Sequence, residues 1–154
     1  MTGEFDLIAR HFRRAQDARA PGVVLAGGDD CALLAPTPGM QLAISTDTLV
    51  EGVHFPRDTP PADIGWKALA VNLSDLAAMG ATPRGCVLAL TLPLVDDAWV
   101  ATFAEGFLAL ADAAHCPLVG GDTTSGPLSI TVTVFGEVPA GEALRRAGAR
   151  AGDL

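Results

Sequence analysis

The sequence predicts an α+β or α/β domain in which helices pack on one β-sheet. Short β-rich segments alternate along the chain with two substantial apolar helices, predicted at residues 64–79 and 98–114. The chain has 154 residues, of which 49% are hydrophobic, and this is enough for one core. No internal repeat or low-complexity linker divides the chain, so a single domain is expected.

The first part of the chain predicts one helix and three strands. Residues 4–16 place apolar side chains at helical spacing and predict an amphipathic helix. Two brief apolar runs predict short strands at 22–25 and 31–35, and the second is closed by a turn at Pro36–Gly39. Residues 41–50, QLAISTDTLV, alternate and are β-rich, so they predict a longer strand.

The second part carries the two long helices and three further strands. Residues 64–79 are apolar nearly all round and are followed by Gly80, the residue type expected just past a helix end. They therefore predict a buried helix. A strand is predicted at 85–92, before the second helix. A short strand at 117–119 and a long one at 129–138, with alternating threonines, complete the series.

Composition limits the possible partners. The net charge of −8 argues against a nucleic-acid surface, which needs clustered Lys and Arg. No run approaches the ~18 apolar residues of a membrane helix, and the first residues lack a secretory pattern. Cys31, Cys86 and Cys116 are odd in number and have no metal-type spacing, so we expect reduced thiols in a cytoplasmic protein.

Four of the 18 acidic residues lie in unusual places. Most of the acids, Asp17 among them, are expected to be surface charges in loops or helix starts. Asp30 instead follows a glycine pair, Asp47 lies in a predicted strand, Asp75 lies in an apolar helix, and Asp122 ends an apolar run in LVGGDTTSGPL. A carboxylate in apolar surroundings is costly unless its charge is compensated. With only ten Lys and Arg in the chain, a divalent cation is the predicted compensator.

The neighbours of these acids indicate which cation. They include the hydroxyl side chains Ser45, Thr46, Ser74, Thr123 and Thr124. Oxygen-only ligation selects Mg²⁺ or Ca²⁺. Asn72 and Asp75 lie three residues apart on one helical face and predict a second oxygen site, although Lys67 could also pair with Asp75. The glycine pairs 27–28 and 120–121 would let backbone N–H groups approach phosphate. The LVGGDTTSGPL stretch is therefore interpreted as a metal and phosphate cradle at a strand end.

Four motifs stand in order along the chain, GGDDCALL (27–34), STDTLVEGVHF (45–55), KALAVNLSDLAAMGATPRG (67–85) and LVGGDTTSGPLSITVTVFG (118–136). Together they resemble the thiamine-monophosphate kinases, within the ATP-dependent superfamily typified by aminoimidazole-ribonucleotide synthetase. The VEGVHF segment is what points to the thiamine enzymes within that superfamily. The resemblance covers nearly the whole chain.

The resemblance implies direct in-line transfer of the γ-phosphoryl group of ATP to thiamine monophosphate, giving thiamine diphosphate. It also implies several Mg²⁺ ions, with no covalent nucleophile. The implied metal ligands are Asp30, Ser45, Thr46, Asp47, Asp75 and Asp122. The implied ATP contacts are Gly121, Asp122 and Arg146, and His54 would contact thiamine monophosphate. The sequence does not decide whether Asp29 also takes part in binding beside Asp30.

The resemblance also implies an α+β fold with a mixed β-sheet and helices on one face (PurM-like), and a homodimer formed by joining sheets. Residues 1–154 would be the N-terminal ATP- and magnesium-binding domain, and the C-terminal domain of the family is not in this sequence. This chain alone is therefore expected to bind nucleotide weakly and not to turn over. The chain has no tyrosine, so any aromatic contact of the family to adenine would have to come from another residue, such as Phe103 or Phe107.

Three alternatives remain open at this point. The first is another superfamily member with a different acceptor, such as aminoimidazole-ribonucleotide or selenophosphate synthetase. The second is a non-catalytic domain for dimerisation or metal binding, whose acids hold structural ions. The third is a globular domain whose acids are coincidental. Nucleotide binding that depends on the acids would separate the enzymes from the other two.

Overall fold

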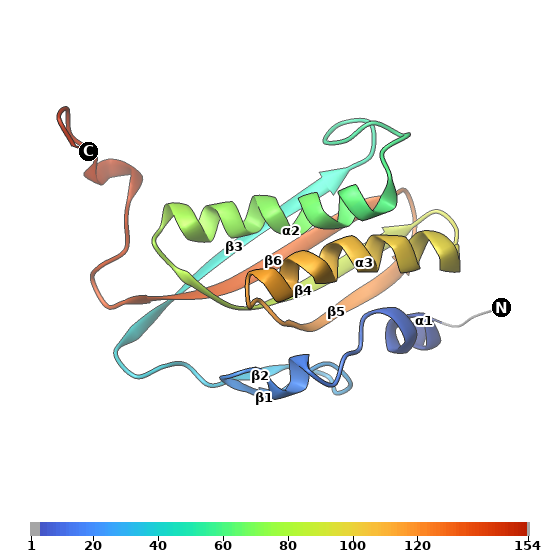
Figure 1. The fold of residues 1–154 in the computed structure, drawn as a ribbon, viewed down its shortest axis with the longest axis horizontal. Helices are drawn as coiled ribbons and strands as arrows, with labels where there is room; N and C mark the ends of the chain where they lie inside the picture. Colours follow the sequence, from blue (N-terminus) through green and yellow to red (C-terminus); the bar gives the residue numbers. More distant parts are fainter. Residues whose placement is uncertain (1–3, 154) are drawn as a thin grey trace.

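The computed structural model describes residues 4–153 as a mixed four-stranded sheet with two long helices on one face (Figure 1). The strand order is β3 (Met40–Val50), β6 (Ser129–Pro139), β4 (Thr82–Leu92) and β5 (Leu118–Ser125). Strand β6 runs antiparallel to both β3 and β4, whereas β4 and β5 are parallel. The predicted α+β class, with a mixed sheet and helices on one face, is confirmed.

The two long helices are α2 (Pro61–Ala78) and α3 (Asp97–Ala113). Helix α3 connects β4 to β5, as a parallel strand pair requires a crossover. The Asp96 side chain caps α3 by accepting hydrogen bonds from two backbone amides of the first turn. Both helices begin and end within three residues of their predicted bounds. No helix within residues 4–153 combines the length and apolar character needed to cross a membrane.

Short elements flank the sheet, namely α1 (Glu4–His11), η1 (Asp17–Arg19), β1 (Val23–Leu25), β2 (Leu33–Leu34) and η2 (Arg146–Gly148). Strands β1 and β2 form a separate two-stranded sheet. The prediction of a helix up to residue 16 was wrong. The backbone amides of Phe12 and Arg13 both donate to the carbonyl oxygen of Ile8, and the regular helical pattern ends there.

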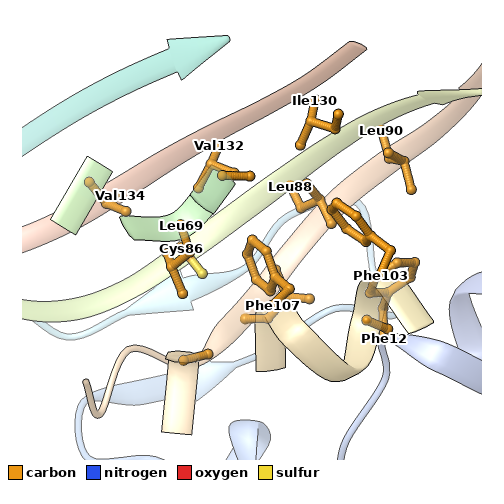
Figure 2. Packing of buried hydrophobic residues seen from close by; sticks show 14 of the residues in the cluster. Phe12, Leu69, Cys86, Leu88, Leu90, Phe103, Phe107, Ile130, Val132 and Val134 are labelled. Atoms are coloured by element: carbon orange, nitrogen blue, oxygen red, sulfur yellow. The ribbon is translucent and has the colours of Figure 1, made fainter. Parts of the chain in front are cut away.

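The hydrophobic core lies between the two long helices and the sheet. Figure 2 shows Phe103 and Phe107 between α3 and the strand that carries Leu88 and Leu90. Both phenylalanine rings are fully buried. The expectation that one of them contacts adenine is therefore wrong, because these side chains form the apolar stripe by which α3 packs on the sheet.

The two helices approach each other through two glycines. A Cβ atom at Gly65 of α2 would overlap the carbonyl oxygen of Phe103, and one at Gly106 of α3 would overlap that of Ala62. In both cases the obstacle is backbone, which cannot move aside as a flexible side chain can. The closeness of α2 and α3 therefore depends on these two positions.

Strand β5 is longer than predicted. The sequence predicted a strand only at 117–119, but the ladder with β4 continues through the glycine pair, Asp122 and both following threonines to Ser125. Gly121 has φ 154°, and a Cβ atom there would overlap the carbonyl oxygen of Leu88 on β4. These glycines thus allow close strand pairing, and the predicted cradle lies along an edge strand instead of beyond its end.

Candidate functional site

A first group of predicted ligands gathers where α2 lies over β3. We call Ser45, Asp47 and Asp75 the β3–α2 cluster. The Ser45 Oγ hydroxyl donates to Asp75 Oδ2 at 2.6 Å, which joins the strand to the helix. Ser45 and Asp47 are two residues apart on β3, so their side chains point to the same face of the sheet. That face is the one covered by the helices, because their ladder partners on β6, Val134 and Val132, are core residues.

Asn72 of α2 supports this cluster from within the core. Its side chain is fully buried, and its Oδ1 atom accepts a hydrogen bond from the backbone N–H of Asp47 at 3.1 Å. Its Nδ2 group donates to the carbonyl oxygen of Ala68 at 3.0 Å. The interpretation of Asn72 as part of a metal site is corrected here, because its side-chain oxygen is already engaged. Its role is to fix the backbone of β3 beside α2.

The variant Asn72→Ala is expected to lower the free energy of unfolding by about 2 kcal/mol, because it leaves the Asp47 N–H without its partner. Chemical denaturation measures this loss. Asn72→Leu keeps a similar volume without the acceptor and tests whether the hydrogen bond or the volume matters. A loss below about 0.5 kcal/mol in Asn72→Ala would contradict the assigned role.

The predicted ligands are less buried than the sequence suggested. Asp30, Asp75 and Asp122 are exposed, and Asp47 is half-buried. The premise that these acids are forced into apolar surroundings was therefore wrong. Asp75 lies on the side of α2 that reaches the edge strand β3, so an apolar helix sequence did not imply a buried carboxylate. Exposure leaves the carboxylate oxygens accessible to an ion or a ligand.

A second group lies at the opposite edge of the sheet. The loop Gly27–Asp30, between β1 and β2, lies beside β5, because a Cβ atom at Gly27 would be 3.5 Å from the carbonyl oxygen of Val119. Asp29 Oδ1 accepts a hydrogen bond from the backbone N–H of Asp30 at 2.8 Å. Asp29 thus shapes the loop through one carboxylate oxygen, and both Asp29 and Asp30 are exposed.

Asp122 projects from the other face of the sheet. Its ladder partner is Ala89, which in turn pairs with Thr131, and this row lies opposite the helices. Thr46 lies on this open face too, where its hydroxyl group is 2.8 Å from that of Thr133. The open face therefore presents hydroxyl groups near its middle and the Asp122 carboxylate at one edge.

One chain does not bring the two groups together. Strands β3 and β5 are separated by β6 and β4, which amounts to about 14 Å at normal strand spacing. Within residues 4–153, no three His, Cys, Asp or Glu side chains gather closely enough to hold a metal ion. The predicted six-residue ligand set is thus divided between two edges of the sheet, and it stays a prediction.

His54 lies in the loop after β3. Its Nδ1 atom accepts a hydrogen bond from the backbone N–H of Val50 at 3.0 Å, so the ring proton is on Nε2 in this arrangement. The carbonyl oxygen of His54 accepts from the Lys67 ammonium group at 2.5 Å. Lys67 therefore fixes this loop instead of pairing with Asp75. The exposed imidazole is left with an N–H donor suited to an anion.

Arg146, the last predicted ATP contact, is exposed in η2 beyond the end of β6. The backbone N–H of Leu144 donates to the carbonyl oxygen of Met79, which places this segment near the end of α2. Within the described residues, no hydrogen bond joins Arg146 to Asp122. Its nucleotide role stays a prediction.

Two acids that the sequence did not single out are buried. Asp17, predicted as a surface charge, is 5% exposed and pairs with both Nε and Nη2 of Arg14 at 2.8 Å. Glu137 is 4% exposed and contacts Arg84. The backbone N–H of Thr37 donates to Glu137 and holds the pKa of that carboxyl below its usual range. The spacing of Arg14 and Asp17 could have indicated the first pair.

The three cysteines are free thiols, as predicted. Cys86 and Cys116 are buried together between β4 and the segment before β5, and Cys31 is exposed. The hydrogen bond to Cys116, together with burial, raises the pKa of the Cys86 thiol well above its usual range. This thiol is therefore poorly suited to act as a nucleophile.

Residues 28–138 match the family model of the AIR synthase related proteins, N-terminal domain. The chain is also similar to curated proteins. Thiamine-monophosphate kinase from Salmonella typhimurium is 56% identical to it over 151 residues, which are 98% of this chain and 46% of that protein. The chain thus spans about half the length of the curated relatives it matches.

Solved structures show the same fold. A crystal structure of thiamine-monophosphate kinase from Stenotrophomonas maltophilia superposes with a TM-score of 0.83 at 54% identity, covering 91% of this chain and 44% of that one. A structure described as AaThiL complexed with AMPPCP and TMP has a TM-score of 0.64 at 34% identity, covering 68% and 35% of the two chains.

Proposed function

Because this chain belongs to the AIR synthase related proteins, whose N-terminal domain its residues 28–138 match, we propose that it is the ATP- and magnesium-binding part of a thiamine-monophosphate kinase. The reaction is transfer of the γ-phosphoryl group of ATP to thiamine monophosphate. The observation that carries this proposal is the 56% identity to such a kinase across 98% of the chain. The complex of a similar protein with AMPPCP and TMP supports both substrates.

The residues of the two groups suit magnesium. Carboxylate and hydroxyl oxygens are ligands of hard cations, and Ser45, Asp47 and Asp75 already converge at β3 and α2. Asp30, Thr46 and Asp122 are the further ligands of the proposal. Bound Mg²⁺ would neutralise phosphate charge as two anions approach. The acceptor phosphate is ionised at pH 7, so the chain need not supply a strong general base.

We propose that a second copy of this chain joins the two groups. Strands β3 and β5 are the two edge strands of the four-stranded sheet, and each carries part of the ligand set. Exposed edges of this kind are ready to pair with another strand. On the open face, Leu42 and Ile44 of β3 are 55% and 61% exposed, so that face would bury apolar side chains on pairing.

The symmetry of such a dimer gives it two equivalent sites. If β3 of each protomer pairs with β5 of its partner, two four-stranded sheets close into a barrel without free edges. Thr46 of one protomer would then share the open face of the joined sheet with the partner's Asp122, whereas Asp47 would lie on the face covered by the helices. Each site would combine Thr46 at the β3 edge of one chain with Asp122 at the β5 edge of the other.

His54 is the proposed contact to thiamine monophosphate. Its Nε2–H group is free to donate, because Nδ1 is engaged by Val50. The exposed loop that carries it follows β3 directly, at the same edge as the β3–α2 cluster. Its donor would position the acceptor phosphate beside the metal ligands.

Arg146 and Gly121 are the remaining proposed nucleotide contacts. The chain spans about half of its curated relatives, so we propose that it is the N-terminal domain and that turnover needs the rest of such an enzyme. The free thiols of the described chain are consistent with a cytoplasmic setting, which is part of the proposal.

Calorimetric titration with AMPPCP, with and without Mg²⁺, tests the function. We expect weak binding that requires Mg²⁺, and binding of thiamine monophosphate that is stronger when AMPPCP·Mg²⁺ is present. His54→Ala should weaken the binding of thiamine monophosphate and leave the binding of AMPPCP unchanged. A folded chain that binds Mg²⁺ but neither ligand would instead indicate a non-catalytic metal-binding domain.

A further inference from the structure

The segment 21–38 forms an arm whose two ends meet. It leaves the body of the domain at Gly22, passes through β1, the Gly27–Asp30 loop and β2, and returns at Thr37. The backbone N–H of Ala35 donates to the carbonyl oxygen of Gly22 at 2.8 Å, which closes the base of the arm. The loop of the second ligand group therefore lies within this arm.

The arm has little packing of its own. Its two strands are three and two residues long, and Val24 and Leu33 are 67% and 52% exposed. A two-stranded ribbon without a covered face is marginally stable at best. A small pocket lies under the base, lined by Pro21, Leu34 and Phe135 and also by the charged side chains of Arg84 and Glu137. Apolar packing alone is thus a weak attachment.

An ion pair of the main sheet, in which Glu137 is buried and Arg84 is half-buried, lies under both ends of the arm. Glu137 of β6 accepts a hydrogen bond from the Thr37 N–H through Oε1 at 2.7 Å. Its Oε2 atom is 3.3 Å from Nε of Arg84 on β4. The Arg84 guanidinium occupies the place that a side chain at Gly22 would take. One end of the arm therefore contacts the carboxylate, and the other contacts the guanidinium.

We propose that Arg84 and Glu137 are positioning residues, a clasp that fixes the arm and so places Asp30 beside β5. This inference rests on the proposed function in one respect only, namely that the Gly27–Asp30 loop binds a ligand. The clasp acts through the backbone of the arm, and neither side chain touches the ligand. Removing Arg84 leaves the Glu137 carboxylate buried and unpaired, whereas removing both charges does not.

Three variants test the clasp in the 154-residue chain. Glu137→Gln and Arg84→Met each remove one charge, and the double variant Arg84→Met/Glu137→Gln removes both while keeping an acceptor for Thr37. Asp97→Asn, which breaks an exposed ion pair with Arg10 on another part of the surface, is the control. Hydrogen exchange is followed separately in residues 23–34 and in β4 and β6.

Each single variant is expected to speed exchange in residues 23–34 at least tenfold, with little change in β4 and β6. The double variant should restore protection to within about threefold, since no unpaired charge remains. Unchanged exchange in the arm, or an equal rise in β4 and β6, would overturn the proposal. So would a double variant no better protected than the singles.

The exchange experiment needs no nucleotide, so it decides the clasp independently of the proposed function. Affinity for AMPPCP with Mg²⁺ is then measured on the same variants. We expect about a tenfold loss in each single variant and recovery in the double variant. Intact affinity in a chain whose arm exchanges quickly would overturn the positioning role. Absence of binding in the unmodified chain would count against the proposed function alone.

Discussion

Replacing Gly106 by alanine is expected to lower the free energy of unfolding by about 3 kcal/mol, the upper range for overpacking. The new methyl group would overlap the carbonyl oxygen of Ala62 on α2, so the two helices would have to separate. Their separation would loosen the core around Phe103 and Phe107. The gain in helix propensity from glycine to alanine, about 1 kcal/mol, offsets only part of this loss.

Chemical denaturation of Gly106→Ala measures the effect, with Gly148→Ala as the matched control. Gly148 is exposed, has no positive φ, and leaves open space where the methyl group of an alanine would lie. The control should change stability by less than about 0.5 kcal/mol. If Gly106→Ala were as stable as the control, the close helix contact would not be a determinant of the fold.

Asp75→Asn is expected to weaken Mg²⁺-dependent binding of AMPPCP at least tenfold, which corresponds to about 1.4 kcal/mol or more. The amide keeps the size of the side chain and can still accept the hydrogen bond from Ser45, but it loses the negative charge that a cation requires. Since the side chain is exposed, unfolding free energy should change by less than about 0.5 kcal/mol.

Asp63→Asn is the control for this variant, because Asp63 is another exposed acid on the same helix. It should bind AMPPCP like the unmodified chain. Calorimetry with and without Mg²⁺ gives both affinities. Equal affinities in the two variants would show that Asp75 is a surface charge and that the β3–α2 cluster is not a metal site.

Much of the fold could be predicted from the sequence, because most elements carry their own periodicity. Residues 41–50 alternate as a half-buried strand does, and residues 64–79 end at a glycine, so their structural bounds differ from the predictions by only a few residues. Strand β5 could not be found in this way. Gly120 to Thr124 have turn-like composition, and only their pairing with β4 makes them a strand.

The candidate site was predictable in its residue types but not in its burial. Asp75 lies in an apolar helix sequence, yet it is exposed because α2 covers an edge strand. Asp17 and Glu137 look ordinary in the sequence, yet both are buried. Asp17 pairs with Arg14, three residues before it, whereas tertiary packing brings Arg84 of β4 to Glu137 of β6. Periodicity along one element does not reveal which residues of another element it will meet.

The division of the ligands between two sheet edges could not be read from motif order either. Asp47 and Asp122 belong to motifs of the same resemblance, but β6 and β4 lie between their strands. The separation is a property of strand order, which the sequence alone left undetermined. It is also the observation that makes a second copy of the chain necessary to the proposed site.

The most direct test mixes the variants Thr46→Val and Asp122→Asn, which remove two proposed ligands on the same open face, after joint unfolding and refolding. If each site takes Thr46 from one protomer and Asp122 from its partner, each variant alone has no intact site. Half of all dimers in the mixture are then heterodimers, and each heterodimer has one intact site of two. About a quarter of the Mg²⁺-dependent AMPPCP binding capacity therefore returns. A mixture that binds no more than the separate variants would contradict the shared site.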